Sequence, residues 1–153
     1  MTVPAPFCRL RTGLRYARLT ALYAAYGVLK HVVPISRLAR PSPVRPSAES
    51  DPVAVRRRIG EVLRISRLFG ASGGDCLQRS LLMFRELRDA GAQPSLVFGF
   101  RKEEDGRLRG HAWVVCGGTV SGDEPSELAR FQVAWTLPSE GTAGASARPT
   151  PTA

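Results

Sequence analysis

A chain of 153 residues, 43% of them hydrophobic, can bury one hydrophobic core but hardly two, so we expect a single globular domain with appendages. Most of its formal net charge of +9 lies in the N-terminal third, because residues 1–48 contain eight basic residues and no acidic one. This cationic segment predicts an anionic partner surface, whether acidic peptide, acidic protein or phospholipid. Without a zinc-finger spacing or an aromatic RNA-binding signature, we do not expect nucleic acid as a partner.

Cysteines and histidines are few and scattered along the chain. The three cysteines, Cys8, Cys76 and Cys116, show no paired spacing, which argues against both a disulfide framework and a zinc site. Only His31 and His111 could supply imidazole ligands. We therefore expect a cytoplasmic protein without a metal or other cofactor.

The N-terminal segment has the pattern of an amphipathic helix. Residues 1–8 are expected to be loose, and a helix is predicted from Leu14 to Val33. Its longest uncharged run, residues 19–29, is too short to cross a bilayer, and no convincing signal-peptide cleavage site follows. We expect this helix to pack on the domain or on a partner, and peripheral contact of residues 9–33 with a membrane surface is the remaining alternative.

Two further helices are predicted after a proline-rich linker. The linker covers residues 34–52 and contains five prolines. A helix then begins at Asp51-Pro52 and runs to about Phe69, since proline suits the first helical turn. After a turn at residues 71–74, the next helix should run from Cys76 to about Asp89.

The remainder of the chain changes to the period of β-strands. Strands are predicted at residues 95–102, 111–116 and 119–123, with a charged turn at 103–109 and one more strand or a mixed closing segment at 127–137. Helices followed by antiparallel strands indicate an α+β fold. We divide the chain into a basic helix and linker (1–50), a catalytic domain (51–138) and a disordered tail (139–153).

Cys76 follows Gly73-Gly74 and a potential cap, Asp75, at the head of its helix. The free N–H groups and positive dipole end of a helix favour a thiolate, so this cysteine is a candidate nucleophile. The alternative is a small apolar residue that begins a buried helix. A thiolate enzyme also needs an imidazole to move its proton and a third group to orient that imidazole, and His111 is the only histidine of the predicted core.

A carboxylate close to His111 is predicted from the hairpin that follows. A two-residue turn at Gly117-Gly118 would set Glu124 opposite His111, whereas a three-residue loop would set Asp123 there. We favour the three-residue loop, because glycine suits its left-handed position. Asp123 is then the candidate orienting carboxylate, and Glu124 is the alternative.

Two runs of sequence resemble a known enzyme family. The runs DCLQRSLLMFRELRDAGAQPSLVFGF and GHAWVVCGGTVSGDE are similar to the leader peptidases of lasso-peptide biosynthesis, which are transglutaminase-like cysteine proteases. The resemblance covers residues 52–137. It implies a papain-like core in which the cysteine-bearing helix packs on an antiparallel sheet, with Cys76 as nucleophile, His111 as general base and acid, and Asp123 as orienting carboxylate.

The resemblance also implies partners. It is closest to the split form of the family, which acts on a precursor peptide together with a stand-alone leader-recognition protein, before an ATP-dependent macrolactam cyclase. The Cys76 backbone N–H would be one oxyanion donor, and Gln78 is expected to be solvated or packed. Two alternatives remain open, namely another acyltransferase or amidase of the same fold and a non-catalytic partner-binding module.

Overall fold

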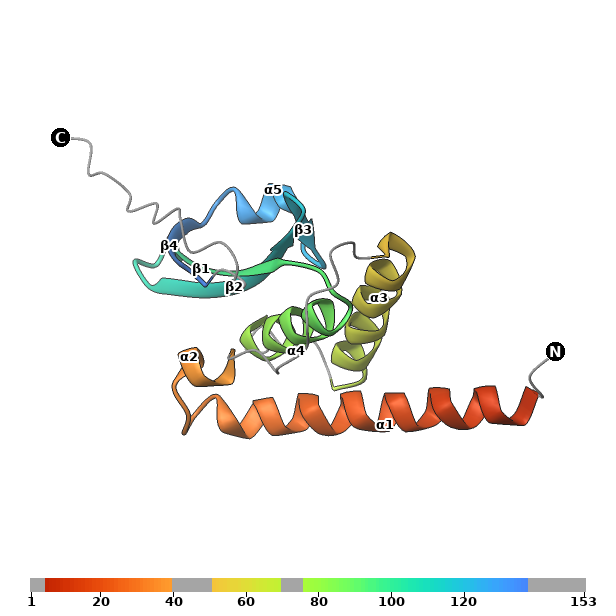
Figure 1. Cartoon of the computed structure of the whole chain (residues 1–153). Helices are drawn as coiled ribbons and strands as arrows, with labels where there is room; N and C mark the ends of the chain where they lie inside the picture. Colours follow the sequence, from red (N-terminus) through yellow and green to blue (C-terminus); the bar gives the residue numbers. More distant parts are fainter. Residues whose placement is uncertain (1–4, 40–50, 70–75, 138–153) are drawn as a thin grey trace.

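The structure is a computed structural model that describes residues 5–39, 51–69 and 76–137 (Figure 1). It is a mixed α and β fold in which N-terminal helices precede an antiparallel four-stranded sheet, which confirms the predicted fold class. The elements are α1 (Ala5–Leu29), α2 (Ile35–Leu38), α3 (Pro52–Leu68), α4 (Cys76–Asp89), β1 (Pro94–Lys102), β2 (Leu108–Cys116), β3 (Thr119–Ser121), α5 (Pro125–Leu128) and β4 (Gln132–Leu137).

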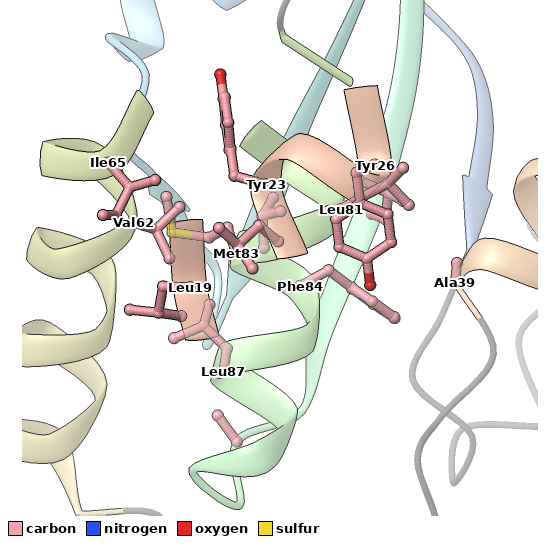
Figure 2. Close-up of a cluster of buried hydrophobic side chains, with 14 residues drawn as sticks. Leu19, Tyr23, Tyr26, Ala39, Val62, Ile65, Leu81, Met83, Phe84 and Leu87 are labelled. Carbon is pink, nitrogen blue, oxygen red and sulfur yellow. The ribbon is translucent and has the colours of Figure 1, made fainter. Parts of the chain in front are cut away.

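Helix α4 lies at the centre of the fold, between the sheet and α1 (Figure 1). It runs from Cys76 to Asp89 as predicted, and eight of its residues are buried, among them Leu81, Leu82 and Met83. These side chains form one hydrophobic cluster with residues of α1, α3 and the sheet (Figure 2). Because α4 contacts every layer, its first residue is held in a fixed position relative to the strands.

The N-terminal helix packs on the domain. Leu19, Tyr23 and Tyr26 of α1 are buried in the same cluster as α4. The helix begins at Ala5, so the expectation that residues 5–8 are loose is wrong, and it ends at Leu29 rather than at Val33. Within the described residues, no helix combines the length and the apolarity that a membrane span requires.

The buried carboxylate of Glu86 in α4 pairs with arginines from α1 and α3. Glu86 of α4 is 1% exposed and accepts a hydrogen bond of 2.6 Å from Arg58 of α3. Arg18 of α1 lies 3.4 Å from the other Glu86 oxygen. A buried charge must be paired, so this cluster fixes how α1 and α3 pack on α4.

The sheet has the order β3-β2-β1-β4 with antiparallel neighbours. β1 and β2 form a long hairpin in which Gly99 pairs with His111. β4 begins at Gln132, and the end of the short helix α5 occupies the start of residues 127–137, for which the sequence predicts one more strand or a mixed closing segment. Proline at the first helical position favours this helix.

The hairpin between β2 and β3 corrects the favoured register. Cys116 pairs with Thr119, so the turn consists of Gly117 and Gly118 alone, and the predicted three-residue loop is wrong. Both glycines have positive φ, 57° and 76°, as a type I′ turn requires. Such a turn follows the right-handed twist of the strands, which is why it is preferred here.

Helix α3 confirms the predicted proline start. The Asp51 side chain accepts a hydrogen bond of 2.9 Å from the backbone N–H of Val53, which caps the helix. The short helix α2 lies within the segment predicted as a linker. The turn at 71–74, the cap Asp75 and the tail at 139–153 lie outside the described residues.

Candidate active site

Cys76 is the first residue of α4, and its thiol is half-buried against β2. Burial opposes ionisation of the thiol. Hydrogen bonds from the His111 ring and from the backbone N–H groups of Ala112 and Leu77 favour the thiolate, and together they lower the pKa of Cys76. The position therefore provides what a thiolate nucleophile needs.

The first turn of α4 docks on the open edge of β2. β3 pairs with β2 only as far as Val114, which leaves Ala112 beyond the end of that pairing. The Ala112 carbonyl accepts a hydrogen bond of 2.8 Å from the buried Ser80 hydroxyl, and its N–H faces the Cys76 sulfur. Two contacts to a single residue of β2 thus set Cys76 beside His111, the residue that precedes Ala112.

The His111 ring lies between the thiol and a carboxylate. Its Nε2 atom is 3.3 Å from Asp123 Oδ1, and the ring also forms a hydrogen bond with the thiol of Cys76. Hydrogen bonds to Asp123 and then to Cys76 raise the pKa of His111 to about 9, against the opposing effect of burial. The lowered thiol pKa and the raised imidazole pKa both favour the pair of thiolate and imidazolium over the neutral pair.

Asp123 contacts His111, although the two-residue turn predicts Glu124 at that position. β3 ends at Ser121, and Gly122 adopts a φ of 87°, so the chain leaves the extended path just before Asp123. Glu124 is exposed and precedes the first turn of α5. Asp123, the carboxylate favoured from the sequence, therefore lies next to the imidazole because the chain bends at Gly122, and not because of a three-residue loop.

Arg79 is a member of the site that sequence reasoning did not identify. Its Nη2 atom donates a hydrogen bond of 2.5 Å to Asp123 Oδ1, the same oxygen that faces His111. Burial alone would raise the pKa of Asp123, but His111 and Arg79 outweigh it and lower this pKa. The available signal was the position of Arg79, three residues after Cys76 and so on an adjacent helical face.

Two aromatic rings flank His111, one from β2 and one from the residue just before β4. Trp113 is nearly parallel to the imidazole at 6.0 Å between centroids, and Phe131 lies at 5.2 Å. Trp113 can occupy this place only because residue 99 is glycine, since a Cβ there would lie 2.8 Å from the indole ring.

The other candidate residues do not join this group. Gln78 is buried and donates a hydrogen bond of 2.6 Å to the Tyr23 carbonyl of α1, so it is packed and turned away from the thiol. Cys116 lies at the far end of β2, and burial raises its pKa. Among the described residues, no group of three His, Cys, Asp or Glu side chains could hold a metal ion.

A cysteine at a helix N-terminus, an imidazole on the adjacent strand and a carboxylate behind it are the groups of a thiol-dependent acyl-transfer site. Residues 16–136 match the transglutaminase-like superfamily, and the chain belongs to that superfamily. The match starts within α1 and ends within β4. No curated protein and no solved structure shows a significant match.

Proposed function

We propose that this protein is a cysteine peptidase that removes the leader peptide from a ribosomally synthesised lasso-peptide precursor. The observation that carries the peptidase assignment is the contact of Cys76 with His111 and of His111 with Asp123. The substrate class is supported by the similarity of residues 75–100 and 110–124 to lasso-peptide leader peptidases. A stand-alone recognition protein would deliver the precursor, and a separate ATP-dependent cyclase would then close the macrolactam.

The first half-reaction forms a thioester. His111 takes the thiol proton, and Cys76 Sγ attacks the scissile carbonyl carbon, so that its π electrons move onto oxygen. When the tetrahedral intermediate collapses, the C–N bond breaks and the imidazolium gives its proton to the leaving amine. The core peptide leaves with a free amino group, and the leader remains bound to Cys76 through a C–S bond.

The second half-reaction hydrolyses the thioester. Water attacks the thioester carbon while His111 accepts a water proton, and the C–S bond breaks when the second intermediate collapses. The leader leaves as a carboxylate, and the thiol with its imidazole is restored. The backbone N–H of Cys76, at the positive end of α4, is suited to stabilise the oxyanion in both halves.

Mass spectrometry of the precursor, incubated with the recognition protein and this chain, tests the proposal. We expect wild type to give two fragments, and Cys76→Ala and His111→Ala to give none. Asp123→Asn should slow cleavage by at least about a hundredfold because it leaves the imidazole unoriented. Glu124→Gln is the matched control, since Glu124 is exposed, and it should cleave like wild type. Cleavage by Cys76→Ala would contradict the proposal.

The superfamily match favours one alternative, because transglutaminase-like proteins include acyltransferases as well as peptidases. In an acyltransferase an amine replaces water in the second half-reaction, and the product carries a new amide in place of a new carboxylate. Adding a primary amine to the same incubation distinguishes the two activities. Incorporation of the amine in preference to hydrolysis would favour the acyltransferase.

A further inference from the structure

The Asp123 carboxylate is held through a single oxygen. Oδ1 accepts the hydrogen bond of 2.5 Å from Arg79 and lies 3.3 Å from His111 Nε2. The second oxygen, Oδ2, is buried and has no hydrogen-bond partner among the described residues. The contact with Arg79 is therefore the shorter of the two interactions that fix where Oδ1 lies, and the contact with His111 is the longer and weaker one.

Arg79 lies on the same helix as the nucleophile, one turn after Cys76. Its hydrogen bond crosses from α4 to the segment that follows β3, where Gly122 has just turned the chain. The Arg79 side chain is 22% exposed and that of Asp123 is 13% exposed, so water only partly screens the pair. One helix thus presents the thiol and also holds the carboxylate that faces the imidazole.

We propose that Arg79 is a positioning residue that holds Asp123 Oδ1 against His111 Nε2, so that the carboxylate stabilises the imidazolium paired with the Cys76 thiolate. A part for Arg79 in catalysis rests on the proposed function, whereas the contacts of Asp123 Oδ1 with Arg79 and His111 are independent of it. The groups that face the carboxylate are Arg79 from α4 and His111 from β2, and the imidazole in turn faces Cys76 from α4.

Positioning and simple electrostatics change the pKa of His111 in opposite directions when the arginine is removed, whereas the pKa of Cys76 rises in both cases. If Arg79 acted only through its positive charge, its loss would raise the pKa values of both Cys76 and His111, because a cation disfavours protonated imidazole and favours thiolate. If Arg79 positions Asp123, its loss frees the carboxylate. The pKa of His111 then falls, the thiol loses its imidazolium partner, and the pKa of Cys76 rises.

The test measures both groups without any substrate in Arg79→Met, in Arg79→Lys and in the control Arg88→Met. Arg88 lies on the same helix, where it stacks on Phe84, so its removal deletes one charge and leaves the contact with Asp123 intact. The His111 pKa is read by NMR of the ring carbons, and the Cys76 pKa by the pH dependence of iodoacetamide alkylation, resolved by peptide mass spectrometry. Circular dichroism checks the fold, and Arg79→Gln, which keeps an N–H donor, replaces any variant that does not fold.

For Arg79→Met we expect the His111 pKa to fall by about one unit and the Cys76 pKa to rise by about one unit. Arg79→Lys should recover part of both shifts, and Arg88→Met should match wild type. A parallel rise of both pKa values, or no change in either, would overturn the proposal. A wild-type protein that shows the ion pair but does not cleave the precursor would refute the proposed function and leave the role of Arg79 standing.

Discussion

At Cys76, burial and hydrogen bonding act in opposite directions on the same thiol. Burial is the largest single influence and favours the neutral form, while His111 and two backbone N–H groups favour the anion. The net lowering of the Cys76 pKa therefore depends on these hydrogen-bond partners, which together outweigh burial.

His111→Ala tests this balance. The variant removes the main group that offsets burial, so we expect the pKa of Cys76 to rise by at least about one unit. At a pH below both values, alkylation of Cys76 should slow about tenfold, because its rate follows the thiolate fraction. Cys116, whose raised pKa has burial as its cause, serves as an internal reference and should not change. Equal alkylation rates in the variant and wild type would show that the N-terminus of α4 activates the thiol without a contribution from His111.

The Ser80 side chain contributes to the packing of the first turns of α4 on β2. Its buried hydroxyl donates to the Ala112 carbonyl, and Ser80→Ala would leave that carbonyl without its partner. We expect a loss of about 1–3 kcal/mol in the free energy of unfolding and a fall of about tenfold in turnover as Cys76 moves away from His111. Chemical denaturation and precursor cleavage measure the two effects. Ser126→Ala, at an exposed position of α5, should stay within about 0.5 kcal/mol of wild type in stability.

At the scale of elements, local signals predicted α3 and α4 better than α1 or the last hairpin. The bounds of α4 follow from an apolar period that begins at Cys76 and stops before Gly91, and Asp51-Pro52 marks the start of α3. The hairpin register depended on one extra residue in a turn, and both registers satisfied the pattern of the strands. Arg79 was missed because its contact depends on the bend at Gly122, which no local pattern reveals.

Gly122→Ala tests how that bend positions Asp123. Its φ of 87° is unfavourable for alanine by about 1–2 kcal/mol, and a Cβ there would lie 3.0 Å from Met83 Cε and 3.1 Å from a Leu63 methyl carbon. We expect lower stability in thermal unfolding, together with a loss of activity that exceeds the loss of folded protein.

Gly118→Ala provides the matched control for this substitution. Its φ is 76°, so the backbone penalty is similar, but a Cβ there meets nothing within 4 Å. This variant should lose about 1–2 kcal/mol of stability and keep its turnover number when folded. If both variants lost turnover equally, the bend at Gly122 would have no special role in placing Asp123.

At the scale of the whole molecule, the N-terminal helix and the strands share one core. The basic composition of residues 1–48 predicts an anionic partner outside the chain, but the buried face of α1 packs on α3 and α4. The Gln78 side chain donates to the Tyr23 carbonyl, and Gly27 leaves room for its amide, since a Cβ at residue 27 would lie 3.1 Å from it. Helix α1 therefore supports α4 from the side opposite the sheet.

Leu19→Ala measures how much of the fold depends on that support. Leu19 is fully buried between α1 and its neighbours, so the substitution should cost about 2–5 kcal/mol through lost burial and the cavity that remains. That is a large part of the roughly 5–15 kcal/mol that stabilises a domain. Leu14→Ala, on the same helix at 73% exposure, should change stability by less than about 0.5 kcal/mol. Denaturant unfolding compares the two variants. If Leu19→Ala unfolded like Leu14→Ala, packing of α1 would contribute little to the stability of the fold, and binding of a partner by its basic face would be the better explanation of the helix.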